Sequence, residues 1–357
     1  MTQNSIPHSM GKIKGREKVL IIQFSPLGDI LLTLPVAEYL KTHWPGLQID
    51  FLMYGAYRPL VENNPHIDKV LTLSGSSKGG LKRKVSYIPE RFFTAIRMRE
   101  EKYDIVLDYI GHSSSALLSY FSAASVTAGY GSLRLRGRLY NTKAYHPPVK
   151  RYSVDKKYDL LEPVLGKVEN PLTQTRMYLT EEETQAAKKY FDEKNLTGKF
   201  TVLFSPDSPR VKKKWAEESY IKLGRLLSER YGAKILLLYG PGEEECSQII
   251  QKGIGESAIL LPPTSVREAA ALLKEVSLTV LNDGGVKHIA VAVETPSVSI
   301  FGGTDLTSWH PPKLEWARAI QGEYEEGDNS FKISPERVME EIETMISAGY
   351  ISVLKKP

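Results

Sequence analysis

The sequence predicts an α/β protein with two parallel, doubly wound sheets of the Rossmann type, and three observations lead to this fold class. The chain has 357 residues, whereas a single domain typically has roughly 100 to 200, so we expect two domains. Its composition, 41% hydrophobic and 25% charged, is that of an ordinary globular protein. Short apolar runs alternate with helical patterns, and this alternation restarts in the second half of the chain.

In the first half, the apolar run 18–24 predicts a buried strand, and apolar residues after the following turn recur at helical spacing. Further strands are expected at 48–54, 69–73 and 104–109, and helices at 89–102 and 114–124. The stretch 109–133 has no charged residue, but its seven serines and three glycines make it too polar for a membrane span.

The second half repeats this pattern. Strands are expected at 200–204, 234–239, 258–261, 278–281 and 297–301, and helices at 215–230, 243–252, 265–276, 286–293 and 335–346. We therefore expect a flexible tail (1–17), two Rossmann-like domains (18–170 and 171–330) and a C-terminal helix and tail (331–357) that could pack back on the N-terminal domain. Two such sheets would direct the carboxyl ends of their strands toward a shared cleft, where ligands of open α/β sheets bind.

The net charge of +5 is distributed unevenly along the chain. Residues 1–170 hold 24 Lys and Arg against 15 Asp and Glu, a balance of +9, whereas residues 171–357 hold 23 against 27, a balance of −4. The tract 129–157 alone has eight basic residues and one acidic residue. This excess favours a polyanionic partner, such as a phosphorylated glycolipid, a membrane surface or nucleic acid, although a basic run is equally typical of a solvated face.

Two loops of the N-terminal and central chain carry groups that suit a reaction. In the first, Gly28 and Asp29 follow the first strand, where the Asp is either a reactive carboxylate or a partner of the helix dipole. Gly28 would let a ligand approach the backbone closely. The second loop, 205–215, joins a strand to a helix and has four cations and two hydroxyls. Its donors would suit a diphosphate, and a solvated basic loop is the alternative.

Two later loops also follow strands. In 239–245, an acidic residue could bind ribose hydroxyls, but acidic residues are also favoured in a first helical turn. The loop 281–288 places Gly284 and Gly285 after a strand, flanked by Asp283 and His288. The two glycines would bring backbone amides close to a ligand at a helix N-terminus, whereas an ordinary turn beside a packed histidine is the alternative.

Several motifs are absent from the sequence, which narrows the function. There is no G-x-G-x-x-G after the first strand, no P-loop, no G-x-S-x-G, no H-E-x-x-H and no C-x-x-C. No D-x-D occurs, so a diphosphate would be neutralised by protein donors rather than by a metal held on two carboxylates. With one cysteine, Cys246, and no apolar signal segment in 1–15, the cytoplasm is the expected compartment.

Taken together, the loops and their spacing resemble glycosyltransferase family 9, the ADP-heptose:lipopolysaccharide heptosyltransferases. The matching segments, within 18–312, are KVLIIQFSPLGDILLTLPVAEYL, ENNPHIDKVL, EKYDIVLDYIGHSSSALLS, SPDSPRVKKKWAEESYIKL and LNDGGVKHIAVAVETPSVSIFGGTD. The resemblance implies a GT-B fold, with an N-terminal acceptor domain and a C-terminal nucleotide-sugar domain facing a central cleft. It also implies an inverting transfer without metal or cofactor, most naturally of heptose from ADP-heptose onto an anionic lipopolysaccharide inner core, in the cytoplasm or at its membrane.

The resemblance also assigns roles to residues. Asp29 would be the general base and Lys213 would hold the diphosphate. For donor binding the resemblance points to Ser208, Glu243, Asp283, Gly285 and His288, and the glycine pair of the same loop adds Gly284. The close backbone approach at Gly28 and the charge of the basic tract predict acceptor binding by Gly28, Arg134, Arg136 and Arg138. Two positions depart from the family pattern, because Asp207 adds a carboxylate beside the proposed diphosphate and Gly284 replaces the usual threonine or serine.

Two alternatives from other functional classes stay open at this point. A nucleotide-sugar 2-epimerase of the same architecture would need no lipid acceptor, which leaves the +9 half without a role. A non-catalytic protein could bind sugar or nucleic acid, since tyrosines are interleaved with the basic residues of 129–157. We expect a glycolipid and a nucleotide-sugar as partners, with peripheral membrane contact and no nucleic acid.

Overall fold

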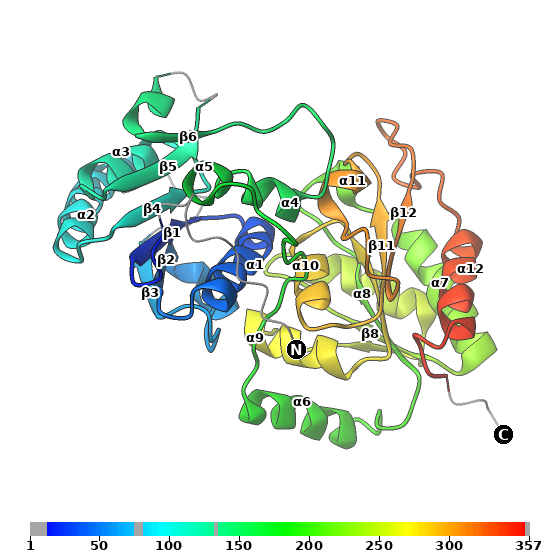
Figure 1. Ribbon diagram of the computed structural model, residues 1–357. Helices are drawn as coiled ribbons and strands as arrows, with labels where there is room; N and C mark the ends of the chain where they lie inside the picture. The colour runs from blue at the N-terminus through cyan, green and yellow to red at the C-terminus, as the bar shows by residue number, and fades with distance from the viewer. Residues whose placement is uncertain (1–12, 75–80, 132–134, 354–357) are drawn as a thin grey trace, which may run out of the picture. The chain divides into compact units, whose positions relative to one another are not determined.

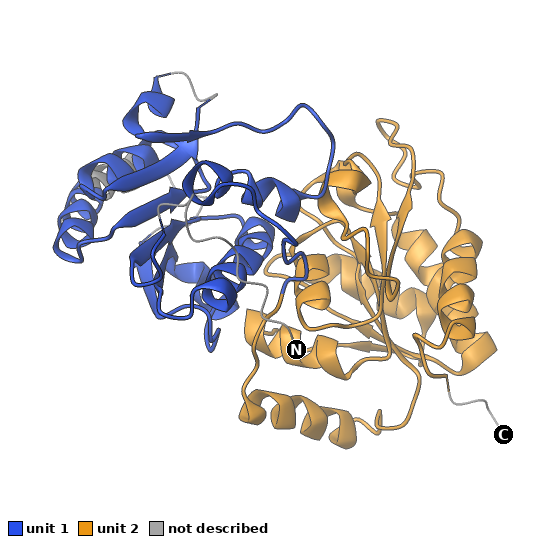
Figure 2. Ribbon diagram, viewed as in Figure 1, with its two compact units in different colours: residues 1–175 blue, residues 176–357 orange. Residues whose placement is uncertain are grey.

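The computed structural model describes residues 13–74, 81–131 and 135–353, except for the side chains of 81–88. The chain divides into an N-terminal unit, residues 1–175, and a C-terminal unit, residues 176–357 (Figure 2). The division lies close to the boundary that the sequence predicts, between residues 170 and 171.

The N-terminal unit contains a six-stranded parallel sheet with the strand order β3-β2-β1-β4-β5-β6 (Figure 1). Its strands are β1 Lys18–Ile22, β2 Gln48–Tyr54, β3 Lys69–Leu73, β4 Ile105–Asp108, β5 Val126–Tyr130 and β6 Thr142–Ala144. The main helices are α1 Leu27–His43, α2 Leu81–Glu100, α3 Ser113–Phe121, α4 Ser153–Tyr158 and α5 Glu162–Leu165, with 3-10 turns η1 Gly55–Leu60 and η2 Arg136–Leu139. Strand β1 lies inside the sheet, between β2 and β4. Its apolar side chains are buried on both faces, because helices cover both faces of a parallel sheet.

The C-terminal unit repeats the architecture with the order β12-β11-β10-β7-β8-β9. Its strands are β7 Thr201–Ser205, β8 Lys234–Leu237, β9 Ala258–Leu260, β10 Leu278–Asn282, β11 Ser297–Phe301 and β12 Ala317–Gln321. Its helices are α6 Glu181–Glu193, α7 Glu217–Tyr231, α8 Glu244–Ile254, α9 Val266–Glu275, α10 Gly285–Ala292, α11 Leu306–Trp309 and α12 Pro335–Ser347, with the 3-10 turn η3 Val211–Lys213. The two sheets confirm the predicted α/β class with two Rossmann-like units.

The C-terminal helix α12 packs against α7 and completes the core of its own unit (Figure 1). Val338 and Ile342 are fully buried there in the same cluster as Trp215. The Trp215 indole N–H donates to the carbonyls of Ser330 and Ile333 at 3.1 Å each, which fixes the chain that leads into the helix. The apolar face of α12 therefore belongs to the C-terminal unit, which differs from the expectation that it packs on the N-terminal domain.

Short elements account for most of the remaining differences from the sequence prediction. The uncharged stretch 109–133 divides between α3 and β5, and β6 and β12 add an outer strand to each sheet. Within the described parts of the chain, no helix combines the length and the apolar character needed to cross a bilayer.

Candidate functional site

Each sheet has a topological switch point beside its first strand. In the N-terminal unit β1 lies between β2 and β4, and in the C-terminal unit β7 lies between β8 and β10. Ligands of open α/β sheets bind at the carboxyl ends of the strands at such a point. We call the loops after β1 and β4 the N-terminal switch point, and the loops after β7 and β10 the C-terminal switch point.

Asp29 lies at the N-terminal switch point, in the first turn of α1. Buried β1 carries the chain to this edge, and Pro26, in an extended conformation, precedes the first helical residue. The Oδ1 atom of Asp29 is 3.2 Å from Nζ of Lys157 in α4, and 25% of the Asp29 side chain is exposed. The site therefore offers a carboxylate that is reachable from solvent and backed by a cation.

Lys157 is the more deeply buried partner of this pair, with 10% of its side chain exposed. Its Nζ also lies 3.4 Å from Oε1 of Gln23 and 5.7 Å from the ring centre of Tyr109. Burial lowers the pKa of Lys157 below its usual range, and the negative charge of Asp29 opposes that shift. The ammonium therefore depends on Asp29 for compensation of its charge.

The basic tract 129–157 is not a uniformly solvated face, because Lys157 points inward and other members are anchored. Arg136 donates from Nη1 to the carbonyl oxygen of Gly111 at 3.2 Å, and Arg151 pairs with Asp159. Arg138 is exposed, whereas Arg134 lies outside the described residues. The structure thus brings Arg136 to the loop after β4 and leaves the acceptor role of the arginines as a prediction.

That loop is held in place by Asp108, the buried last residue of β4. Its carboxylate accepts hydrogen bonds from the N–H groups of Ile110 and Gly111, both at 3.0 Å, and from the Tyr140 hydroxyl at 2.6 Å. Burial raises the pKa of Asp108, and these hydrogen bonds oppose the shift. Because the Arg136 anchor is Gly111, Asp108 also fixes the place of that arginine.

At the C-terminal switch point, Asp283 is buried and receives three donors. Its Oδ2 is 2.5 Å from Nζ of Lys213 and 2.8 Å from Oγ1 of Thr304, and its Oδ1 is 3.1 Å from Nζ of Lys287. Burial alone would raise the pKa of Asp283, but the two ammonium groups and the hydroxyl hold it well below its usual range. Two cations against one carboxylate leave a charge of +1, which suits an anionic ligand.

The two lysines of this cluster differ in access. Lys287 is fully buried, donates to the carbonyl oxygen of Trp309 at 2.7 Å and lies 4.8 Å from the ring centre of Phe301. Burial lowers the pKa of Lys287 to about 8, and Asp283 opposes that shift. Lys213 keeps 15% of its side chain exposed. Lys213 is therefore the cation that can reach a ligand, while Lys287 holds Asp283 in place.

Asn282, the last residue of β10, joins the two loops of the C-terminal switch point. Its Nδ2 donates to the carbonyl oxygen of Pro206 at 2.6 Å, and its Oδ1 accepts a hydrogen bond from the backbone N–H of Trp215 at 3.1 Å. Both partners belong to the segment after β7 that contains Lys213. The amide therefore sets the position of that segment relative to Asp283.

The other predicted donor residues lie at the same edge of this sheet. Ser208 is half-buried in the loop after β7, and Glu243 follows β8, the neighbouring strand. Oε2 of Glu243 accepts the Gly240 N–H at 3.0 Å, so this carboxylate closes its own turn. Its expected contact with a ribose stays a prediction.

The start of α10 follows Asp283 directly. Gly284 is the N-cap and Gly285 the first helical residue. His288 is buried one turn later, with its ring centre 6.4 Å from that of Trp309. Burial lowers the pKa of His288 well below its usual range, so the ring is neutral at pH 7. Helix α10 therefore begins with two glycines, next to the ionised carboxylate of Asp283.

The structure gives physical reasons why the two departures from the family pattern are tolerated. The carboxylate of Asp207 is 3.3 Å from Nζ of Lys214, a cation that it shares with Glu217 at 3.1 Å, so its negative charge is partly compensated by its neighbours. Gly284 has φ −153°, an extended backbone that any residue adopts. A Cβ atom there would meet only the Asn282 carbonyl oxygen, at 3.8 Å, which is an ordinary contact.

Sequence reasoning missed four residues of these two sites, namely Asn282, Lys287, Thr304 and Lys157. The spacing of four between Asp283 and Lys287 is a signal that could have indicated their ion pair on a helix. No comparable signal exists for Lys157, because 128 residues separate it from Asp29. Only the fold brings those two together.

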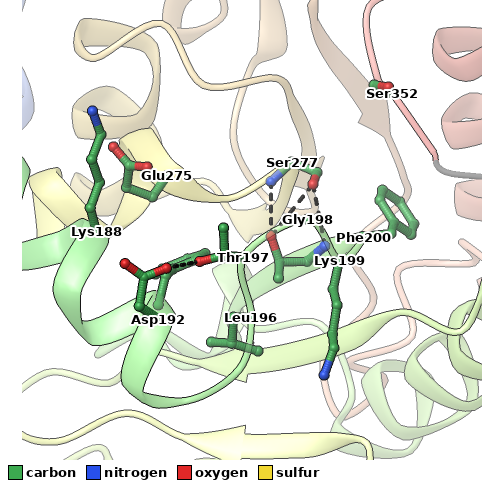
Figure 3. A pocket seen from close by; sticks show the side chains of 12 residues that line it. Lys188, Asp192, Leu196, Thr197, Gly198, Lys199, Phe200, Glu275, Ser277 and Ser352 are labelled. Atoms are coloured by element: carbon green, nitrogen blue, oxygen red, sulfur yellow. Dashed lines mark hydrogen bonds between the residues drawn. The ribbon is translucent and has the colours of Figure 1, made fainter.

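A cavity of 550 Å³ lies at the opposite edge of the C-terminal sheet (Figure 3). It is lined by Thr201, the first residue of β7, and by Ser277, which precedes β10, and both are therefore at the amino ends of their strands. Lys188 and Glu275 also line it. None of the predicted site residues lines this cavity, so it is separate from the switch point.

Comparison with known proteins identifies relatives of the chain. The model of glycosyltransferase family 9 (heptosyltransferase) matches residues 92–336. Lipopolysaccharide heptosyltransferase 3 of Escherichia coli K12 is 28% identical over 291 residues, which cover 80% of this chain and 82% of that protein.

Solved structures of similar fold support the same comparison. The glycosyltransferase family 9 protein of Veillonella parvula superposes with a TM-score of 0.80 at 21% identity, covering 93% of this chain and 97% of that one. The ADP-heptose lipopolysaccharide heptosyltransferase II of E. coli superposes with a TM-score of 0.77 at 21% identity, covering 93% and 99%. These likenesses confirm the expected GT-B fold class.

Proposed function

Since the chain belongs to glycosyltransferase family 9, the heptosyltransferase family, we propose that it transfers heptose from ADP-heptose to the inner core of a lipopolysaccharide. The names of the relatives support the donor and the acceptor, because one is a lipopolysaccharide heptosyltransferase and another is an ADP-heptose lipopolysaccharide heptosyltransferase. Family membership also favours a glycosyltransferase over the epimerase and the non-catalytic binding protein.

The observation that carries the proposed mechanism is the quarter-exposed carboxylate of Asp29 at the N-terminal switch point. In an inverting transfer, an acceptor hydroxyl oxygen bonds to the anomeric carbon while the bond from that carbon to the diphosphate oxygen breaks. The hydroxyl proton passes to Asp29, which later releases it to water. Lys157 stabilises the ionised carboxylate before the transfer, and general-base assistance of this kind typically contributes about 10²- to 10⁴-fold in rate.

Lys213 supports the departure of the diphosphate. Negative charge builds on the leaving oxygens, and a partly exposed ammonium can neutralise it through charge-assisted hydrogen bonds. This ammonium pairs with Asp283, so the carboxylate orients Lys213 at the C-terminal switch point. The Gly284–Gly285 start of α10 would add backbone N–H groups, and no metal ion takes part in the proposed step.

The acceptor belongs to the N-terminal unit in this proposal. Arg136 of η2 contacts the loop after β4, and Arg138 is exposed in the same turn, so both can meet phosphate or carboxylate groups of an inner core. The excess of nine positive charges in residues 1–170 suits such a partner and an anionic membrane surface. We place the reaction in the cytoplasm, at the inner face of its membrane.

The test is a transfer assay with purified protein, ADP-heptose and a heptose-free inner-core acceptor, followed by mass spectrometry and by NMR of the new linkage. We expect one added heptose with inverted anomeric configuration. Parallel reactions with UDP-, GDP- and CDP-sugars test the donor. Transfer only from another nucleotide-sugar would refute the donor assignment, and epimerisation of a nucleotide-sugar without any acceptor would favour the alternative enzyme.

A further inference from the structure

Helices α2 and α3 of the N-terminal unit expose a group of large apolar side chains that the unit does not bury. They are Phe92, Phe93 and Ile96 of α2 and Leu117, Tyr120 and Phe121 of α3, and we call them the α2–α3 patch. Exposures range from 40% for Ile96 to 66% for Phe93. Single exposed apolar residues are normal, but half of the twelve exposed large apolar side chains in the described part of the chain gather on these two helices.

The patch is a continuous surface rather than a set of separate residues. The two helices pack against each other, and a groove of 460 Å³ between them is lined by Phe92, Ile96, Leu117 and Phe121. These four occur as two pairs at a spacing of four residues, so each helix presents one apolar stripe to the groove. Met98 of α2 and Leu118 of α3 belong to the buried core, and Leu118 also forms part of the groove wall. The exposed side chains of the two stripes are therefore not needed to fill the core of the N-terminal unit.

The charge around the patch is positive. In the described part of α2, three arginines, Arg91, Arg97 and Arg99, stand against two glutamates, whereas α3 has no charged residue. Arg97 and Arg99 are exposed beside the aromatic side chains, and Arg99 lines the groove. Aromatic and aliphatic residues flanked by arginines are typical of helices that lie in the interface of an anionic membrane.

We propose that the α2–α3 patch docks the protein on a lipid bilayer that contains anionic lipids, with its apolar side chains entering the interface and the arginines meeting phosphate groups. A second copy of this chain is a poorer occupant, because a symmetric contact would bring the basic α2 helices of both copies together. This docking rests on the membrane location of the proposed function and assigns that contact to one surface, and it requires no donor or acceptor to be bound.

The experiment measures co-sedimentation of the full chain with vesicles of phosphatidylcholine alone or with roughly one third phosphatidylglycerol, at two salt concentrations. We expect binding to the anionic vesicles, and a loss of about tenfold or more in affinity for Phe93→Ser/Phe121→Ser. The control variant, Ile249→Ser/Tyr324→Ser, removes two exposed apolar side chains of the C-terminal unit, 45% and 36% exposed, and should bind like the wild type. Arg97→Gln/Arg99→Gln should weaken binding and reduce its salt dependence.

Three outcomes would overturn the proposal: no binding of the wild type to anionic vesicles, equal loss in the control variant, or patch variants that change only the oligomeric state measured by light scattering. Because all substituted residues are exposed, thermal unfolding should be unchanged, which separates a docking defect from a folding defect. Transfer to a water-soluble acceptor fragment should be unaffected by the patch variants. Failure of docking and failure of the proposed reaction are therefore distinguishable.

Discussion

The ion pair between Asp29 and Lys157 should couple the stability of the N-terminal unit to its proposed reactive carboxylate. At 3.2 Å, two unit charges attract by about 5 kcal/mol at an effective dielectric constant of about 20. Removing two charges from water offsets much of this, and Asp29 is screened because a quarter of its side chain is exposed. We therefore expect a net coupling energy of about 1 to 3 kcal/mol.

The two single substitutions should not be equivalent. Asp29→Asn leaves the ammonium of Lys157 buried, with Gln23 as a weak partner at 3.4 Å, and should cost about 2 to 4 kcal/mol. Lys157→Met leaves a carboxylate that water can reach, so it should cost less. The double variant Asp29→Asn/Lys157→Met should be more stable than the sum of the single effects predicts, because no unpaired charge stays buried.

Guanidinium unfolding at pH 7 of the wild type, both single variants and the double variant gives this coupling energy directly. The matched control is the exposed pair Arg58–Glu62 in the same unit, at 3.3 Å, for which a cycle should give about 0.3 to 0.5 kcal/mol. A coupling energy no larger than that of the control pair, or a Lys157→Met variant less stable than Asp29→Asn, would refute the reasoning.

Three further predictions concern the other groups of the two units. Lys213→Ala should weaken ADP binding, measured by calorimetry, by about tenfold through the loss of charge-assisted hydrogen bonds. An unchanged dissociation constant would show that Lys213 does not bind the diphosphate. Arg136→Gln/Arg138→Gln should raise the acceptor KM, leave the donor KM unchanged and flatten the salt dependence of kcat/KM, whereas equal loss with a phosphate-free acceptor would contradict acceptor recognition. Burial lowers the pKa of His288, so below about pH 6.5 the unfolded chain binds a proton that the folded chain does not bind, and the free energy of unfolding falls on acidification. His288→Gln should therefore reduce the loss of stability between pH 7 and 5 by about 2 kcal/mol. An unaltered pH dependence of the free energy of unfolding would show that the ring is not held neutral.

The sequence predicted the central strands well because their physical signal is strong. The run KVLII of β1 is buried on both faces, so it reads as a continuous apolar segment with a turn after it. Strand β5, VTAGY, lies in a serine-rich stretch and contains an alanine and a glycine, which hide its pattern. Helix α6 could have been recognised, because Thr180 and Glu183 form a capping box at its start.

The residues of the candidate site could be predicted from the sequence only where they directly follow a strand that the sequence itself indicates. Asp29 and Asp283 each follow a central strand, so their place at a switch point follows from the alternation of strands and helices. Lys157 belongs to a basic tract whose members look alike in the sequence, and burial beside Asp29 distinguishes it. Thr304 reaches Asp283 from the loop after a different strand, so that contact depends on the order of the strands in the sheet.

Asp29, as the base that accepts the proton of the acceptor hydroxyl, is the residue on which the proposed reaction depends most. The direct test is the kcat of Asp29→Asn with ADP-heptose and a heptose-free inner-core acceptor, measured at a temperature where the variant is fully folded. We predict a loss of about 10²-fold or more with ADP affinity unchanged, since the base acts on the acceptor and not on the nucleotide. Retention of more than about a tenth of the wild-type kcat would contradict the assignment of the general base.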